Sequence, residues 1–131
     1  MGGAVSQILE ADPRVAAFVK NDHLDFKIPY LFDGVPYDFL PDFLVRLVRT
    51  DESEPERTLI IEVSGSRKDQ AKREVKAQTA RDQWCVAVNN HKGFGVWGFV
   101  EIDNMAHAAY ELSVAIDDLY ADGITTGGTD L

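Results

Sequence analysis

The sequence has few of the features typical of membrane proteins, disulfide-stabilised proteins or ATP-driven motors. Its only cysteine, Cys85, cannot form a disulfide within the chain, which favours a reducing compartment. No apolar run approaches the roughly 20 residues that span a bilayer, and residues 1–6 lack the basic and apolar regions of a signal peptide. The sequence contains no G-x-x-x-x-G-K-[ST] motif, so these residues hold no P-loop motor. We therefore expect a cytoplasmic protein without a membrane partner.

The composition is that of an ordinary globular domain. The chain has 131 residues, of which 45% are hydrophobic and 27% are charged. This length fits one domain with a core that needs no disulfides. We assign that domain to residues 1–122 and expect residues 123–131 to be a flexible tail, because they show no packing pattern.

The charge is distributed unevenly along the chain. The net charge is −9, which by itself argues against a nucleic-acid partner. However, residues 101–131 hold seven acids and no Lys or Arg, whereas residues 67–81 hold six bases and two acids. Because phosphate contacts depend on where the bases lie, this basic segment keeps DNA binding open.

Hydropathy patterning predicts the order helix, three strands, helix, strand, helix. We expect a helix that ends near Ala11, a second helix that starts at Asp12-Pro13 and ends at Lys20, strands over residues 26–32, 35–49 and 58–63, a helix from residue 66 to about 88, a strand over residues 96–102, and a last helix that begins at Asp103 or Asn104 and ends at Gly123. Asp33-Gly34 predicts a tight turn, and residues 50–57 a charged loop. The fold class is α/β, with a right-handed crossover between the last two strands.

Two carboxylates stand in apolar strand segments, Asp42 inside the second predicted strand and Glu62 at the end of the third. Asp42 lies among aromatic and aliphatic residues, and Glu62 directly follows Leu59-Ile60-Ile61. Burial of a lone carboxylate is costly, so such groups are normally paired or bound to a metal. Two carboxylates on adjacent strands could share Mg²⁺, which takes few protein ligands and retains waters. The alternative is that each acid is a solvated strand end or a salt-bridge partner.

These segments resemble the PD-(D/E)xK nuclease superfamily. The resemblance rests on residues 39–46 (FLPDFLVR) followed by residues 59–65 (LIIEVSG), and extends to residues 24–30, 84–89 and 93–97. The sequence is most similar to the C-terminal nuclease domain of type III restriction enzyme Res subunits and related helicase-nucleases. This resemblance implies a restriction-endonuclease-like αβββαβ core, with a mixed central sheet flanked by helices, followed by a C-terminal helix.

The resemblance also implies a metal site and partners. Asp42 and Glu62 would bind Mg²⁺, or Mn²⁺ as a substitute, with the Val63 carbonyl as a third ligand. Glu10 matches a first-helix carboxylate that some members place near the metal, although a solvated helix-end glutamate explains it equally well. The implied partners are double-stranded DNA, a helicase or ATPase domain and a modification subunit; a homodimer is left open.

The chain departs from the family motif at one position. Ser64 stands where the motif lysine is expected, and a hydroxyl carries no positive charge to offset charge that develops on a phosphate. Some members of the superfamily move this lysine to the neighbouring helix, and Lys68, Lys72 and Lys76 recur here at four-residue spacing. The alternatives are a solvated helix face, an impaired site and a substitution that inactivates the protein.

We therefore expect a Mg²⁺-dependent DNA endonuclease domain of the restriction type. The expected catalytic residues are Asp42, Glu62, Ser64, Lys72 and Lys76, and the expected DNA-binding residues are Arg67, Lys68, Lys72, Arg73, Lys76 and Arg81. The main alternative is a catalytically inactive module of the same fold that binds DNA or docks onto a motor subunit. A third hypothesis is an unrelated α/β binding domain, without a metal at Asp42 and Glu62.

Overall fold

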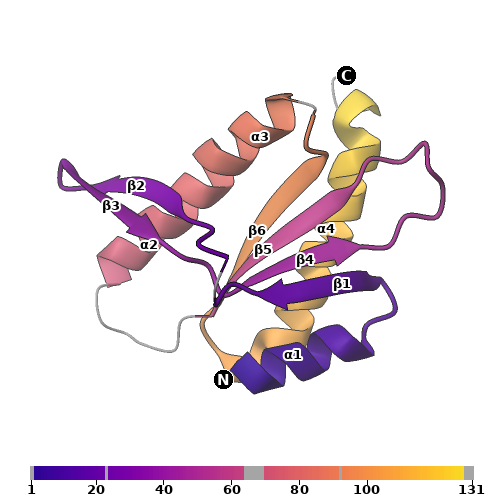
Figure 1. The fold of residues 1–131 in the computed structure, drawn as a ribbon, viewed down its shortest axis with the longest axis horizontal. Coiled ribbons are helices and arrows are strands. Elements are labelled where there is room, and N and C mark those ends of the chain that lie inside the picture. Colours follow the sequence, from indigo (N-terminus) through magenta and orange to yellow (C-terminus); the bar gives the residue numbers. More distant parts are fainter. Residues whose placement is uncertain (1, 23, 64–69, 92, 129–131) are drawn as a thin grey trace.

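The computed structural model describes residues 2–22, 24–63, 70–91 and 93–128. They form an α/β fold with a four-stranded mixed sheet, a β-hairpin, and helices on both faces of the sheet (Figure 1). The sheet has the strand order β1 (Val15–Lys20), β4 (Phe43–Leu47), β5 (Arg57–Val63) and β6 (Val96–Ile102). This confirms the predicted α/β class, the mixed sheet and the C-terminal helix.

Strand β5 is the inner strand on which the fold is organised. It pairs antiparallel with β4 and parallel with β6, in a register that runs from Arg57 opposite Val96 to Val63 opposite Ile102. Its apolar residues Leu59, Ile60 and Ile61 are all buried. A continuous apolar run is typical of a strand that is covered on both faces, and the prediction of a central strand is confirmed.

The hairpin consists of β2 (Ile28–Phe32) and β3 (Val35–Phe39). Asp33 has φ 53° and Gly34 has φ 77°, so both turn residues occupy the left-handed region. This backbone matches the twist of a two-residue hairpin, and Asp-Gly adopts it at little cost. The predicted turn is therefore confirmed.

The prediction of a second helix up to Lys20 is wrong, because residues 15–20 form strand β1. Asp12 and Pro13 make a turn into this strand: the Val15 N–H donates to the Asp12 carbonyl at 3.1 Å, and the Arg14 N–H donates to Asp12 Oδ1 at 2.8 Å. Pairing with β4 satisfies the strand's backbone along one edge. Alanine is a strong helix former, but the preference of the two alanines in this segment does not outweigh that pairing.

The prediction of one strand over residues 35–49 is also wrong. This segment forms β3 and β4, which belong to different sheets and are separated at residues 40–42. Pro41 has no N–H to donate and interrupts strand pairing there. The strands of the main sheet are consequently β1, β4, β5 and β6, with the hairpin inserted between β1 and β4.

The helices are α1 (Gly2–Ala11), α2 (Gln70–Gln78), α3 (Cys85–His91) and α4 (Ala108–Gly128). A π-helical segment (Thr79–Trp84) joins α2 to α3, and the predicted helix start at residue 66 lies outside the described residues. Helix α4 continues past Gly123, where we predicted its end; one glycine costs only about 1 kcal/mol in a helix. Across the described ranges, none of the helices has both the length and the apolarity that crossing a bilayer requires.

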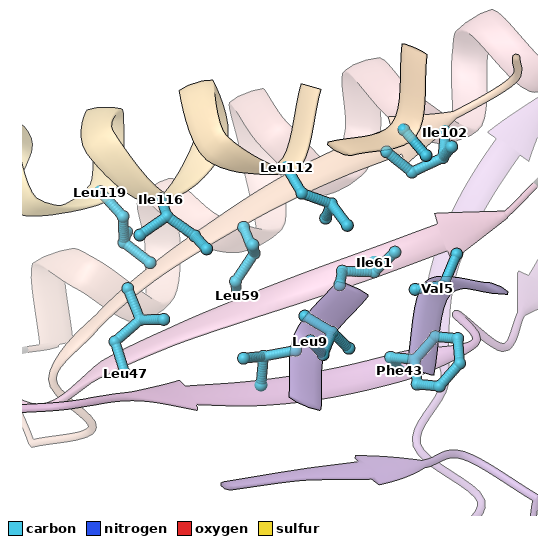
Figure 2. Packing of buried hydrophobic residues seen from close by; sticks show 12 residues of the cluster. Val5, Leu9, Phe43, Leu47, Leu59, Ile61, Ile102, Leu112, Ile116 and Leu119 are labelled. Atoms are coloured by element: carbon cyan, nitrogen blue, oxygen red, sulfur yellow. The ribbon is translucent and has the colours of Figure 1, made fainter. Parts of the chain in front are cut away.

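Helices α1 and α4 cover one face of the sheet with a purely apolar cluster. Figure 2 shows Leu112, Ile116 and Leu119 of α4 pointing onto Leu59 and Ile61 of β5. The other residues of this cluster are Val5, Leu9, Phe43, Val45, Leu47, Ile102 and Ala108. The three-to-four-residue spacing on α4 and the two-residue spacing on β5 bring these side chains to one interface.

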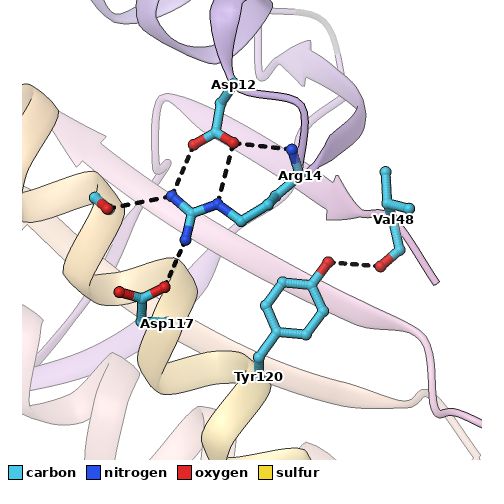
Figure 3. A network of polar contacts seen from close by, with 6 residues as sticks. Asp12, Arg14, Val48, Asp117 and Tyr120 are labelled. Carbon is cyan, nitrogen blue, oxygen red and sulfur yellow. Dashed lines mark hydrogen bonds and ion pairs between the residues drawn. The ribbon is translucent and has the colours of Figure 1, made fainter. Parts of the chain in front are cut away.

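A polar network fastens the turn after α1 to α4 (Figure 3). The Arg14 guanidinium binds Asp12 at 2.9 Å and also pairs with Asp117 of α4. The guanidinium holds the pKa of the Asp12 carboxyl below its usual value. Nearby, the Tyr120 hydroxyl donates to the carbonyl of Val48. The Arg14–Asp117 pair joins residues 103 positions apart in the chain, and the Tyr120–Val48 bond joins residues 72 positions apart.

The opposite face is covered by the hairpin and by the helical segment from α2 to α3. Its buried cluster includes Ile60 of β5, Phe39 of β3 and Ala77 of α2. Side chains therefore alternate along β5: Leu59, Ile61 and Val63 face α1 and α4, and Ile60 faces α2. Glu62 is two residues after Ile60, so its side chain points to the same face, the one covered by α2.

Candidate metal centre

Strands β4 and β5 bring Asp42 and Glu62 together. The paired residues Phe43 and Ile61 lie opposite each other, so the same register, extended by one residue, places Asp42 opposite Glu62. The Asp42 N–H donates to the carbonyl of Ile61 at 2.8 Å, which holds the start of β4 against β5. By the two-residue alternation along each strand, both carboxylates lie on the face of the sheet that α2 covers. The sequence-based expectation that two acids from adjacent strands meet is thus supported by the sheet register.

Backbone hydrogen bonds fix Asp42 from both sides. Its Oδ2 accepts from the Val63 N–H at 2.6 Å, and its carbonyl accepts from the Asn21 N–H at 2.9 Å. The Asn21 side chain is buried and donates to the carbonyls of Phe26 and Pro41, at 2.8 and 2.9 Å. The sequence analysis did not identify Asn21 as a residue of this site. Its position directly after a strand, before a loop that must return to the sheet, gives no signal of this role.

Glu62 is a desolvated carboxylate beside other acids. Its side chain is 15% exposed, and among the described residues its Oε1 is buried with no hydrogen-bond partner. Burial raises the pKa of Glu62 to about 7, with Asp42 and Glu101 adding to the rise and Lys76 opposing it. A buried acceptor without a donor is costly unless a cation or water satisfies it.

Among the residues that the structure describes, Lys76 is the cation paired with this carboxylate. Its Nζ lies 3.6 Å from Glu62 Oε2 and 5.2 Å from the centroid of the Phe39 ring. Lys72, one helical turn earlier, instead lies over the Tyr37 ring at 3.9 Å and near the Phe32 ring at 5.9 Å. The lysines at four-residue spacing therefore do not act as one group. Lys76 points to the carboxylates, and Lys72 points to the aromatic side chains of the hairpin.

Glu101 and Arg73 belong to the same surface, and Glu101 was missed by the sequence analysis. Glu101 lies opposite Glu62 in the β5–β6 register. Arg73 Nε lies 3.4 Å from Glu101 Oε2, and both side chains are less than one-fifth exposed. The signal was available, since Glu101 follows Val100 within an apolar strand just as Glu62 follows Ile61. Arg73, which we expected to bind DNA, is turned towards this acid.

Several expected site residues lie elsewhere or outside the described residues. Glu10 is exposed on α1, and within the described ranges no three His, Cys, Asp or Glu side chains form a group that could hold a metal. Glu10 therefore does not join Asp42 and Glu62. Arg81 is exposed and borders a groove between α3 and α4. Ser64, Arg67 and Lys68 lie outside the described residues.

The donor set at Asp42 and Glu62 fits a hard divalent cation with few protein ligands. It offers two carboxylates, one with a buried oxygen that lacks a partner. Mg²⁺ is commonly held by one or two carboxylates and completes its shell with water and substrate phosphate. Cys85 offers no rival nucleophile, because burial raises the pKa of its thiol to about 12.

Comparison with known proteins gives no match to a protein-family model, a curated protein or a solved structure.

Proposed function

We propose that this chain is a Mg²⁺-dependent DNA endonuclease domain of the restriction type, in which Lys76 replaces the motif lysine. The observation that carries the proposal is the 3.6 Å approach of Lys76 Nζ to Glu62, on the strand that lies beside Asp42. A lysine on a helix next to the sheet can deliver its charge to the same place as a lysine on the strand. Only the ammonium must arrive near the phosphate, and the flexible four-carbon stem permits this.

The element order supports a restriction-endonuclease-like core. Without the inserted hairpin, the chain runs α1, β1, β4, β5, α2–α3, β6, which is the αβββαβ order implied by the sequence resemblance. In this arrangement, Asp42 precedes the second core strand and Glu62 lies near the end of the third. These are the positions at which the PD-(D/E)xK motif places its acids.

The residues divide the chemistry between them. Asp42 and Glu62 would hold Mg²⁺, with the Val63 carbonyl as a further ligand, and the cation would supply an activated water and stabilise the leaving oxygen. Lys76 would move its ammonium from Glu62 towards the scissile phosphate once the metal compensates the carboxylate. A preorganised positive charge at the phosphate lowers the barrier because negative charge grows there during the reaction.

Duplex DNA is the proposed substrate, and the basic segment around α2 would contact its backbone. Arg73 and Lys76 already pair with acids, so fewer free cations face solvent than the sequence suggested. We therefore expect weak duplex affinity that falls steeply with salt. Tight binding and target choice would come from a helicase or ATPase domain and a modification subunit in the full system.

The second candidate function is an inactive module of the same fold that binds DNA or docks onto a motor. The observation in its favour is the Lys76–Glu62 pair itself, because an ion pair that neutralises the acid also stabilises a site without metal. In this case Lys76 would be a structural counterion, and the loss of the motif lysine at Ser64 would leave the domain without catalysis.

A supercoiled-plasmid nicking assay with Mg²⁺ or Mn²⁺ distinguishes the two functions. We expect the wild type to nick and Lys76→Met to slow nicking by about 10²–10³-fold, the typical cost of removing one preorganised charge. Lys72→Met is the matched control, since it removes the same charge from α2 but at a position over the Tyr37 ring. It should weaken duplex binding and leave the nicking rate at saturating DNA near that of wild type. Asp42→Ala, purified in parallel, measures contaminating nuclease and should show no nicking.

Two results would overturn the proposal. Equal nicking by wild type, Lys76→Met and Lys72→Met would remove Lys76 from catalysis. Absence of nicking by wild type, together with strong nicking by Ser64→Lys, would show that the charge is missing in the natural chain and would favour the inactive module.

A further inference from the structure

Strand β6 is an outer strand of the four-stranded sheet, and its free edge lies between two helices. The sheet order ends at β6, which pairs only with β5 among the described strands. Helix α3 packs on one side of β6 and α4 on the other (Figure 1). A cavity of about 560 Å³ runs along this edge, bordered by both helices.

Asn89 of α3 already occupies part of this edge as a strand would. Its side-chain Oδ1 accepts from the Trp97 N–H at 2.7 Å, and its Nδ2 donates to the Trp97 carbonyl at 3.1 Å. The backbone of Trp97 therefore points outward, away from β5. Because N–H and C=O groups alternate in direction every residue along a strand, the backbone of Phe99 points outward as well. The amide of Asn89 marks the place where an added strand would begin.

The two walls of the groove differ in chemistry. The α3 side presents Val86, an apolar side chain with 47% exposure, and Arg81 from the segment that precedes α3. On α4, the groove is bordered by Tyr110, Val114 and Asp118, at four-residue spacing, and by Glu111. The α4 wall is therefore acidic and partly apolar. In an added strand, side chains alternate between the two walls, so apolar residues would meet α3 and basic residues would meet α4.

We propose that β6 and the groove between α3 and α4 bind an extended peptide segment of a partner protein, which adds to the sheet with basic and apolar residues in alternation. Main-chain hydrogen bonds to the edge supply affinity, and the acidic α4 wall selects basic side chains. The proposal does not rest on the nuclease function, because the groove lies on the far side of β5 from β4 and Asp42. The two surfaces share Glu101, which borders the groove and lies opposite Glu62 in the sheet.

The charge distribution disfavours a second copy of this chain in the groove. Residues 101–131 contain seven acids and no Lys or Arg. A symmetric pairing of two β6 edges about an axis perpendicular to the sheet would bring the two α4 helices together on one face. Their acids would then repel each other, whereas a basic peptide would neutralise them.

Titration of the full chain with two synthetic peptides tests this proposal. One peptide alternates Lys and Val over nine residues, and the other alternates Glu and Val. We expect the Lys-Val peptide to bind with a Kd on the order of 10–100 µM at low salt, about −6 kcal/mol, and the Glu-Val peptide to bind at least tenfold more weakly. N-methylation of alternate peptide nitrogens on the edge-facing side should abolish binding, since it removes the donors that the β6 edge needs.

Variants of α4 locate the binding site. The double variant Glu111→Lys and Asp118→Lys should reverse the preference towards the Glu-Val peptide, whereas the control Asp38→Lys and Glu52→Lys changes two exposed acids away from the groove and should retain it. Far-UV circular dichroism confirms that each variant is folded. Absence of Lys-Val binding to wild type, equal binding of the N-methylated peptide, or unchanged preference in the α4 variant overturns the proposal. A concentration-dependent dimer that the α4 variant strengthens would make a second copy the occupant instead.

Discussion

The two faces of the sheet differ in what they bury. The face under α1 and α4 is built from aliphatic side chains and Phe43, which pack without a charged partner inside the cluster. The face under α2 and the hairpin has Ile60 and Phe39 at its centre and two acids, Glu62 and Glu101, at its margin. One strand, β5, contributes to both faces through alternate residues.

The aliphatic face therefore contributes mainly to stability, and the α2 face holds the groups that could do chemistry. Burial of aliphatic groups stabilises the fold at about 25 cal/mol per Å². Burial of Glu62, in contrast, costs free energy, which a cation, a proton or a bound water can offset. A protein retains such a costly group where it has a role, so the α2 face is the place to look for function.

The largest expected effect is a loss of stability on the aliphatic face. Ile116→Ala should lower the free energy of unfolding by about 2–5 kcal/mol, because Ile116 is fully buried between α4 and the sheet. Val75→Ala, on the half-buried margin of the α2 face, should cost only about 1 kcal/mol. Urea denaturation of both variants measures the contrast. Equal losses would contradict the view that the α1–α4 face carries most of the stability.

A smaller effect concerns the pH dependence contributed by Glu62. Its pKa is about 7 in the folded chain against an ordinary value of 4.5, so between these pH values the folded state holds a proton that the unfolded state has lost. Stability from this group is therefore full below pH 4.5 and falls until about pH 7, by about 1–3 kcal/mol. Glutamine does not titrate, so Glu62→Gln should lose less stability than wild type between pH 5 and pH 8. The difference in unfolding free energy between variant and wild type should therefore be more favourable to the variant at pH 8 than at pH 5.

Urea denaturation in the presence of EDTA at the two pH values checks this prediction. Glu52→Gln is the matched control, because Glu52 is exposed in the loop before β5. It should follow the wild type at both pH values. If Glu62→Gln and the wild type lose the same stability between pH 5 and pH 8, Glu62 does not titrate in this range.

Divalent metal should offset the cost of the carboxylates. At ten times its Kd, Mg²⁺ stabilises a folded protein by about 1.4 kcal/mol, and the rise in thermal midpoint should be larger at pH 8 than at pH 5.5, where the metal must displace the Glu62 proton. Mn²⁺ should act in the same way. Asp42→Ala should lose this response, and an identical metal shift in Asp42→Ala and wild type would remove Asp42 from the site.

The smallest effect concerns the polar contact at the margin of the aliphatic face. The Tyr120 hydroxyl donates to the carbonyl of Val48, so Tyr120→Phe should lower the free energy of unfolding by about 0.5–1.5 kcal/mol. Its effect on plasmid nicking should be negligible, because α4 covers the face opposite Glu62. Thermal denaturation and the nicking assay, run on the same preparation, measure both quantities. A slower nicking rate without a loss of stability would contradict this prediction and would show that Tyr120 affects the site on the opposite face.

Much of the fold follows from local patterns in the sequence. The apolar run at residues 58–63 predicts β5, the pattern at residues 96–102 predicts β6 with the observed bounds, and Asp33-Gly34 predicts the hairpin turn. These signals succeed because period, turn chemistry and β-branching agree within a few residues. The first failure is at residues 15–20, whose strand partner β4 lies far away in the chain. The second is at residues 35–49, where Pro41 interrupts the pairing and the two halves join different sheets.

The sequence by itself determined that Asp42 and Glu62 are exceptional, because an acid next to an apolar strand is visible without a structure. Strand periodicity, which is a local property, also puts Glu62 on the face opposite Leu59 and Ile61. The tertiary structure alone decided which lysine meets Glu62. Lys72 and Lys76 are equivalent in spacing, but the packing of α2 against the hairpin directs Lys72 to Tyr37 and Lys76 to Glu62. The direction of a long side chain depends on the surfaces that surround it, and these surfaces come from segments remote in the sequence.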